Sequence, residues 1–152
     1  MRNEALGVDI DNVLVRDSAP VDGAFEALNQ LVNRRFANQV YLVSKCALEQ
    51  ERKTIQWLVD QGFFDRTGVK RAHVYFCRER SDKAGICKKL GITHFIDDRL
   101  EVLSALLSVA HLYLFQPDSE EMRQWTQSLT KQLTLVYSWQ DVLDNLLQAE
   151  SP

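Results

Sequence analysis

The chain has 152 residues and a mass of 17.5 kDa, which suffices for one well-buried core and is too short for two ordinary domains. Hydrophobic residues make up 45% and charged residues 26%, with a formal net charge of -3. This is an ordinary globular composition, and it argues against a protein that holds nucleic acid through bulk positive charge, although it leaves a local basic groove open. We therefore expect a single domain over residues 1–152.

Short apolar runs alternate along the chain with longer stretches of helical periodicity. In chain order we predict strand 5–8, helix 21–35, strand 39–43, helix 48–61, strand 72–76, helix 81–90, strand 93–96, helix 100–110, strand 111–115, helix 119–131, strand 133–137 and helix 138–148. Gly62 and Gly91 follow two of these helices, where a left-handed residue commonly ends a helix.

The predicted strands are nearly continuous apolar runs, such as VYLV and HVYF. Such runs indicate burial on both faces, as in a parallel sheet between two helical layers. We therefore predict a doubly wound α/β fold with three layers, α/β/α.

The amino-terminal sequence MRNEALGVDID has no apolar core followed by a cleavage site, and no apolar run approaches the roughly 18 residues of a membrane span. The expected location is the cytoplasm, without membrane contact. Cys46, Cys77 and Cys87 are odd in number and form no CxxC pair, so we expect reduced thiols rather than disulfides or structural zinc.

Polar side chains follow three of the predicted strands, at the edge where ligands bind in doubly wound sheets. These residues are Asp9 and Asp11, Ser44 and Lys45, and Asp97 and Asp98. Side chains two apart on an extended segment point the same way, so we expect Asp9 and Asp11 to face one site while Ile10 packs into the core.

The carboxylates of Asp9, Asp11, Asp97 and Asp98 would repel one another at this edge unless a cation neutralised them, and an all-oxygen ligand set favours Mg²⁺. Lys83, near the start of a predicted helix, would add a positive charge, and Ser44 a hydroxyl. Both groups suit the oxygens of a phosphoryl group. Taken singly, each residue is more often a turn, cap or surface residue, so the prediction depends on their conjunction.

In this order the residues resemble the four motifs of the haloacid dehalogenase (HAD) superfamily of phosphohydrolases. DIDNV resembles the first motif, DxDx[TV], and LVSKC the second; Lys83 in RSDKAG matches the third, and FIDDR the acidic fourth. The resemblance covers essentially the whole chain and implies a Mg²⁺-dependent phosphomonoester hydrolase. FIDDR and the late segment SWQDVL are similar to deoxyribonucleotidase-like members. Asn12 stands where many members have Gly, and Val13 where Thr is commoner.

The resemblance also implies a role for each matched residue. Asp9 would be the nucleophile that forms an aspartyl-phosphate, and Asp11 the general acid and then the general base. Asp9, the backbone carbonyl of Asp11 and Asp97 would hold Mg²⁺, with Asp98 either as an additional ligand or as a neighbour that supports the ligands. Ser44 and Lys83 would bind the phosphoryl group.

Cap domains of this superfamily enter after the first motif or between the second and third motifs. Residues 15–20 leave no room for the first kind, and residues 44–83 are taken up by one helix and one strand. We therefore expect no substantial cap and an open site. Such a site can admit a nucleotide or a phosphorylated end of a nucleic acid or protein, with Arg78, Arg80 and Arg99 at its rim, or be closed by another subunit of a homo-oligomer.

Two other classes of protein stay open. A HAD-fold protein that binds or scaffolds without turnover would keep the same motifs. A receiver domain also gathers acids, a hydroxyl and a lysine on a doubly wound sheet, but its phosphorylated Asp follows the third strand and its lysine the fifth. This chain has Cys77 and Gln116 at those points, which disfavours a receiver. A dinucleotide-binding protein is excluded by the absence of a Gly-rich turn after the first strand.

Overall fold

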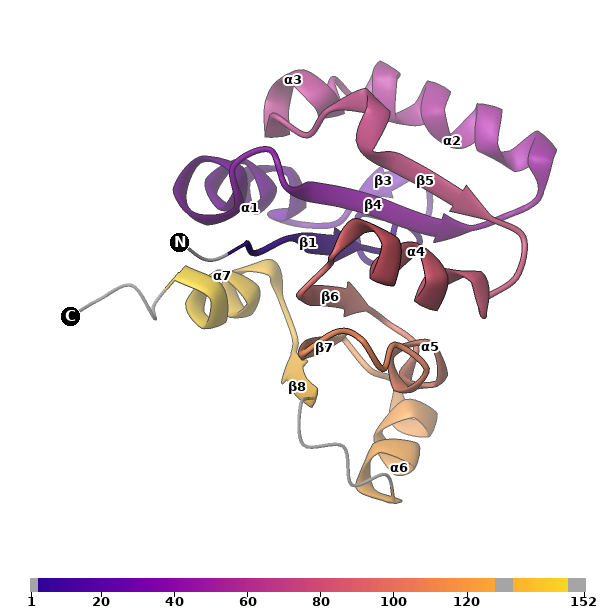
Figure 1. Cartoon of the computed structure of the whole chain (residues 1–152). Coiled ribbons are helices and arrows are strands. Elements are labelled where there is room, and N and C mark those ends of the chain that lie inside the picture. Colours follow the sequence, from indigo (N-terminus) through magenta and orange to yellow (C-terminus); the bar gives the residue numbers. More distant parts are fainter. Residues whose placement is uncertain (1–2, 128–132, 148–152) are drawn as a thin grey trace.

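The computed structural model describes residues 3–127 and 133–147, which form a parallel sheet flanked by helices (Figure 1). The sheet has six strands in the order β5-β4-β1-β6-β7-β8. Their bounds are β1 Leu6–Val8, β4 Val40–Lys45, β5 Val74–Cys77, β6 His94–Asp97, β7 His111–Phe115 and β8 Leu133–Val136. A separate antiparallel hairpin pairs β2 (Val15–Arg16) with β3 (Ala19–Pro20).

The connections between the strands are helical. The helices are α1 Ala24–Leu31, α2 Leu48–Asp60, α3 Phe63–Thr67, α4 Asp82–Leu90, α5 Leu100–Ser104, α6 Ser119–Gln127 and α7 Trp139–Leu147. A π-helical turn, η1 (Val32–Phe36), extends α1, and a 3-10 turn, η2 (Arg71–His73), precedes β5. The predicted α/β fold is therefore confirmed, and no large cap is present in the described part of the chain.

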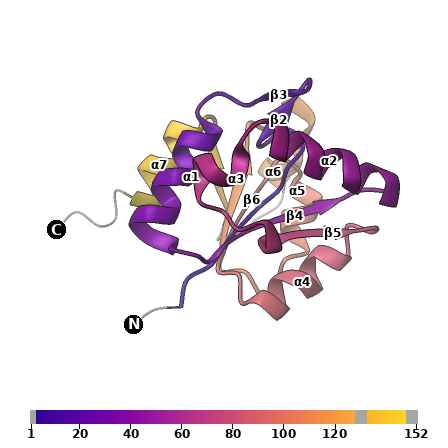
Figure 2. The ribbon, with the colours of Figure 1, turned by 90° about the horizontal axis from the view of Figure 1, so that it is seen from above.

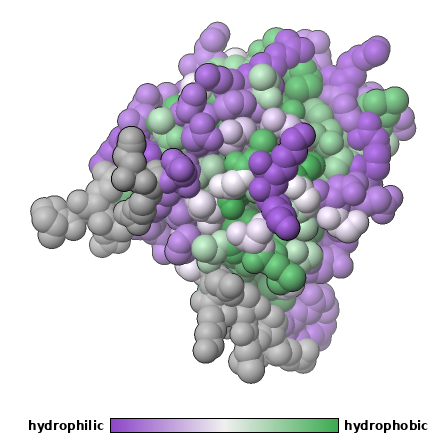
Figure 3. Space-filling view, in the orientation of Figure 1, coloured by the Kyte–Doolittle hydropathy of each residue, from purple (hydrophilic) through white to green (hydrophobic). Residues whose placement is uncertain are grey.

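Each face of the sheet packs against its own helices because neighbouring strand residues point to opposite faces. Val8 and Leu42 lie in a core beneath α1, α3 and α7, whereas Val43 and Phe95 lie in a second core beneath α4 and α5. Figure 2 shows α1 and α7 on one side of the sheet and α4 on the other. Figure 3 shows one face of the molecule, on which hydrophilic residues predominate around the edge and hydrophobic residues lie towards the middle.

The strand order creates a switch point between β1 and β6. From β1 the chain moves outward to β4 and β5, and α4 then carries it back to β6 on the other side of β1. Connections on the two sides of this switch run in opposite directions, so a crevice opens at the carboxyl ends of β1 and β6. Asp9 follows β1 and Asp97 ends β6, so both acids lie at this crevice.

Most predicted boundaries differ from the structure by one to three residues, and three segments differ by more. Residues 15–20 form the β2–β3 hairpin, and α3 lies in the segment expected to be a plain connection. The helix predicted for 100–110 ends at Ser104, where the backbone changes to i−3 hydrogen bonds such as Ala105 N–H to the Val102 carbonyl. Leu106 and Val109 are buried, as their apolar spacing predicts, but this spacing is compatible with tight turns as well as with a helix. Residues 128–131 and 148 of the predicted helices lie outside the described residues.

The two helix ends predicted at glycine are confirmed. Gly62 and Gly91 have φ values of 67° and 68° and follow α2 and α4, so both end a helix in the left-handed conformation. All three cysteines are free thiols. Among the described helices, none is both long and apolar enough to cross a membrane.

Candidate active site

The first pair of acids lies on a tight loop directly after β1. The strand ends at Val8, and the N–H groups of Val13 and Leu14 donate to the carbonyl of Ile10 at 3.3 and 2.8 Å. Ile10 is buried, whereas Asp11 is exposed. The two acids therefore flank a buried isoleucine as predicted, but a turn produces this arrangement rather than the alternation of an extended strand.

Asn12 has φ 67° within this loop, in the left-handed region that costs most residues about 1–2 kcal/mol. Glycine adopts this conformation freely, and asparagine is the next best tolerated residue because its short side chain forms local hydrogen bonds. The departure from the commoner glycine of the first motif therefore has a conformational explanation.

Lys83 joins the ends of β1 and β6. Its Nζ donates to Asp9 Oδ1 at 3.1 Å and to Asp97 Oδ2 at 3.0 Å, and its side chain comes from the first turn of α4. Lys83 is 2% exposed, Asp9 8% and Asp97 0%, so all three charges are withdrawn from water. Buried charges persist only when they are paired and hydrogen-bonded, and here one ammonium serves two carboxylates.

The protonation equilibria of these groups reflect an excess of negative charge. Burial, together with the nearby carboxylate of Asp97, raises the pKa of Asp9 well above its usual value. Burial also raises the pKa of Asp98 to about 6, helped by Asp97 and opposed by a hydrogen bond from the Asn12 side chain. Burial alone would lower the pKa of Lys83, but Asp9 and Asp97 outweigh it and raise that pKa. One lysine thus leaves the cluster short of positive charge.

Three carboxylates of this cluster are placed to share a metal ion. One oxygen each from Asp9, Asp97 and Asp98 lie within 4.8 Å of one another. Oxygen donors with net negative charge suit a hard divalent cation such as Mg²⁺, so the residues fit the predicted ion. The side chain of Asp11 is not in this group; the ligand expected from Asp11 is its backbone carbonyl.

A hollow of about 270 Å³ opens above the cluster. Its walls include Asp9, Asp11, Lys83, Asp97 and Asp98, so five of the six predicted site residues line one space.

Ser44, the sixth, is not in that lining, whereas Lys45 is. Ser44 lies two residues after Leu42 on β4, so strand alternation directs it towards α1 and α2, on the face opposite α4. It is buried, at 3% exposure. Its expected contact with phosphate stays a prediction, and Lys45 is a wall residue to which the sequence assigned no role.

The three arginines expected at the rim are paired with glutamates. Arg78 pairs with Glu51, Arg80 with Glu101, and Arg99 with Glu101 at 2.8 Å and with Glu121 at 3.2 Å. Arg80 and Arg99 line the hollow, and Arg78 does not. Because their charges are already partnered, these side chains do not form a free basic patch.

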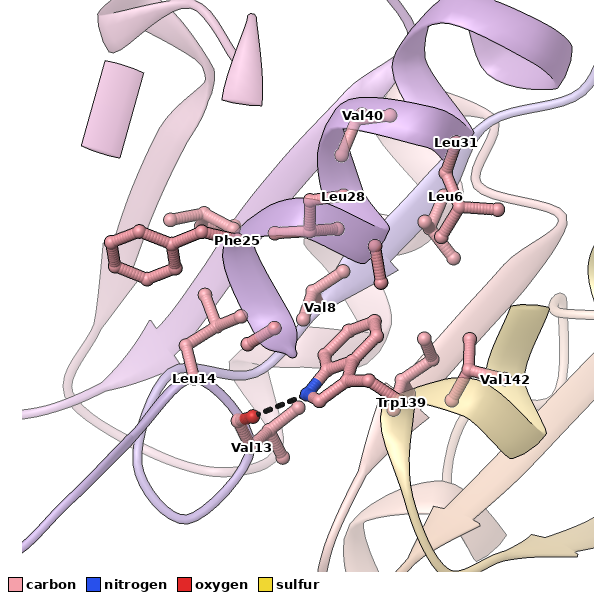
Figure 4. Packing of buried hydrophobic residues seen from close by; sticks show 14 of the residues in the cluster. Leu6, Val8, Val13, Leu14, Phe25, Leu28, Leu31, Val40, Trp139 and Val142 are labelled. Carbon is pink, nitrogen blue, oxygen red and sulfur yellow. Dashed lines mark hydrogen bonds between the residues drawn. The ribbon is translucent and has the colours of Figure 1, made fainter. Parts of the chain in front are cut away.

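Trp139 supports the loop from beneath. Its indole Nε1 donates to the carbonyl of Val13 at 2.9 Å, and its ring packs in the core beside Val8 and Val142 (Figure 4). The segment SWQDVL indicated a family likeness, but its residues alone gave no role for Trp139. No local signal could have revealed this contact, since the two residues are 126 positions apart.

No protein-family profile matches the sequence, and neither does any curated protein. Solved structures with the same fold exist. A magnesium- and phosphate-bound D,D-heptose 1,7-bisphosphate phosphatase from B. bronchiseptica aligns with a TM-score of 0.71 at 16% identity, over 96% of this chain and 99% of that one. The corresponding phosphatase from Burkholderia thailandensis gives 0.64 at 12% identity, over 95% and 98%.

Two further solved structures align with lower TM-scores. A cobalt-bound deoxy-D-mannose-octulosonate 8-phosphate phosphatase from Haemophilus influenzae aligns with a TM-score of 0.56 at 13% identity, over 97% of this chain and 90% of that one. A de novo designed Rossmann 3x3 protein also aligns, at 0.52 and 11% identity, over 97% and 95%. The chain therefore has a fold that several phosphatases use and that a designed protein also has, and activity must be argued from the site.

Proposed function

We propose that the chain is a Mg²⁺-dependent phosphomonoester hydrolase of the HAD superfamily that acts through an aspartyl-phosphate. The observation that carries this proposal is the Lys83 ammonium between Asp9 and Asp97, with Asp98 and Asp11 in the same hollow. Isolated acids at strand ends have ordinary structural roles. A buried lysine that hydrogen-bonds to two buried carboxylates at the switch point is instead typical of a catalytic centre. The phosphatases that share the fold support the same reaction class.

In this proposal Asp9 attacks phosphorus, and the bond from phosphorus to the leaving oxygen breaks. Asp11, which is exposed at the mouth of the hollow, gives a proton to that oxygen. Asp11 then takes a proton from water, the resulting hydroxide attacks phosphorus, and the bond to Asp9 breaks. Phosphate leaves with Asp9 and Asp11 restored to their starting states.

The charges around phosphorus would be held by the remaining residues. Lys83 fixes the orientation of Asp9 and adds positive charge where negative charge develops in the transition state. Asp9, Asp97 and Asp98 would hold Mg²⁺, which supplies electrostatic stabilisation of the phosphoryl oxygens when it is bound. Ser44 stays a proposed phosphate contact.

The proposal is tested with para-nitrophenyl phosphate as a generic substrate. We expect release of nitrophenol that requires Mg²⁺ and is lost in Asp9→Asn, because an amide is a far poorer nucleophile than a carboxylate. Asp65→Asn, an exposed acid of α3, is the matched control and should keep wild-type rates. Activity that survives in Asp9→Asn would remove the assigned nucleophile. No activity in wild type would favour a binding or scaffold protein.

Other expectations also stay proposals. These are the single domain over residues 1–152, the cytoplasmic location, a homo-oligomer, and the likeness to deoxyribonucleotidases, which depends on FIDDR and SWQDVL alone.

A further inference from the structure

A second cleft, of about 440 Å³, adjoins the hollow that contains Asp9. One wall is the loop and hairpin β2–β3, and the other is α2, which the hairpin lies beside in Figure 2. The two spaces share Asp11 and Asn12 as wall residues, so they meet at Asp11. If Asp11 protonates the leaving oxygen, the leaving group lies on the Asp11 side of phosphorus, which is the side of this cleft.

The walls of the cleft are held together by tertiary contacts. Trp57 of α2 donates its indole Nε1 hydrogen to the carbonyl of Ser18 at the tip of the hairpin, at 3.0 Å. The Trp57 ring meets the buried Phe25 edge to face, with centroids 6.1 Å apart. Asp17 and Ser18 have φ values of 53° and 65°, the pattern of a type I′ turn. The cleft thus has a defined shape, and its volume lies within the range of small-molecule pockets, about 300–1,000 Å³.

The lining of the cleft is polar and carries two cations that no acid neutralises. Within residues 3–127 and 133–147, neither Lys53 nor Arg16 has a carboxylate partner within 4 Å. Arg16 instead donates to the carbonyl of Asn12 at 2.9 Å, which directs it along the loop. Lys53 is exposed on the opposite wall, and Thr54 on the same helix supplies a hydroxyl.

This pattern contrasts with that of Arg78, Arg80 and Arg99, each of which is paired with a glutamate. The acids in the cleft lining are Asp11 and Asp17, both on the hairpin side and neither paired with Lys53. Because Arg16 is engaged with the Asn12 carbonyl, an anionic group that enters the cleft finds its unengaged cation in Lys53 of α2, away from the scissile phosphate.

We propose that this cleft binds the leaving group, and that the substrate is a small polyhydroxylated phosphomonoester with a second anionic group that Lys53 of α2 recognises. Lys53 is here a specificity residue and takes no part in bond breaking. The inference builds on the proposed phosphatase activity and adds to it the class of substrate.

The test compares 6-phosphogluconate with glucitol 6-phosphate, two open-chain esters of which only the first has a carboxylate at the end remote from phosphate. A charge-assisted hydrogen bond favours the charged substrate by about tenfold or more, so we expect that ratio of kcat/KM in wild type. Lys53→Gln should bring the ratio to about one, Lys53→Arg should restore most of it, and Lys88→Gln, an exposed lysine of α4, should leave it unchanged.

Hydrolysis of para-nitrophenyl phosphate separates this inference from the proposed function. The nitrophenyl group of that substrate has no anionic substituent for Lys53 to bind, so Lys53→Gln should hydrolyse it at the wild-type rate. The inference is overturned, with the phosphatase intact, if wild type hydrolyses the aryl ester but does not prefer 6-phosphogluconate, or if the preference survives in Lys53→Gln. A deoxynucleoside 5′-monophosphate that reacts at least as well as 6-phosphogluconate would overturn it too. Failure to hydrolyse any of these esters removes both proposals.

Discussion

At the scale of single residues, Asp98 links the chemistry of the site to its stability. Its pKa is about 6 in the fold, against an ordinary value of 3.8, because it is buried beside Asp97. A carboxyl group with a raised pKa holds its proton longer in the folded state, so the free energy of unfolding falls as pH rises from about 4 to about 6. We therefore expect Asp98→Asn to raise the free energy of unfolding of the metal-free protein near neutral pH, by on the order of 1 kcal/mol.

Urea denaturation at acid and neutral pH measures this effect of Asp98. The gain in Asp98→Asn should vanish below about pH 4, where the wild-type carboxyl is protonated in both states. Asp65→Asn should change little at either pH, since Asp65 is exposed. A variant that is less stable than wild type at neutral pH without metal would contradict the excess of negative charge in the cluster.

At the scale of elements, α7 positions the loop that follows β1 through one hydrogen bond. Trp139→Phe keeps an aromatic ring in the core but leaves the Val13 carbonyl without the indole donor. An unsatisfied buried carbonyl costs about 1–3 kcal/mol, and a less well held loop should lower kcat more than it raises KM. Thermal unfolding and steady-state kinetics with an aryl phosphate measure the two effects.

Val142→Ala is the matched control for Trp139→Phe, because Val142 is fully buried on the same helix and truncating it removes packing without touching the loop. It should lower stability while kcat stays near wild type at a temperature where both variants are folded. Equal losses of kcat in the two variants would mean that Trp139 acts through general stability alone.

The spacing of β1 and β6 depends on Gly7. A Cβ atom at this position would lie 2.5 and 2.7 Å from ring atoms of Phe95, its partner on β6. Phe95 is fully buried and cannot swing away. We expect Gly7→Ala to lower the free energy of unfolding by about 1–3 kcal/mol. In a Phe95→Leu background the added cost of Gly7→Ala should be clearly smaller, and additive costs in a double-mutant cycle would argue against this clash.

At the scale of the whole molecule, a bound divalent cation should stabilise the entire fold, because the three candidate ligands are the residue after β1, the last residue of β6 and the residue after β6. Mg²⁺ at about 100 times its Kd should add about 2.7 kcal/mol to the free energy of unfolding. Differential scanning calorimetry measures this stabilisation as a rise in Tm with Mg²⁺, compared with sodium chloride at equal ionic strength. Asp97→Asn should lose the response to Mg²⁺, and an equal rise in Tm for that variant would place the ion elsewhere.

The site was more predictable from sequence than the details around it. Asp9, Asp97 and Asp98 could be chosen because they follow apolar runs, and Lys83 because it lies near the start of a predicted helix; both are local patterns. The hairpin β2–β3 is not evident from the sequence because its turn has positive φ at Asp17 and Ser18, neither of which is the glycine that usually marks such a turn. The sequence does not show which of the two neighbours Ser44 and Lys45 points towards the hollow, so Lys45 was not assigned a role.

Hydrophobic periodicity acts over a few residues, so the amino-acid sequence alone predicts the order of the six sheet strands and of the main helices between them, the burial of those strands and the residue types at their ends. Three features appear only in the folded chain: β6 lies beside β1, Lys83 contacts Asp9 from 74 positions away, and the β2–β3 hairpin and α2 enclose a cleft. The folded chain also shows which cations are paired and which are free. These features depend on contacts between distant segments, and such contacts are settled by how the helices and the sheet pack together.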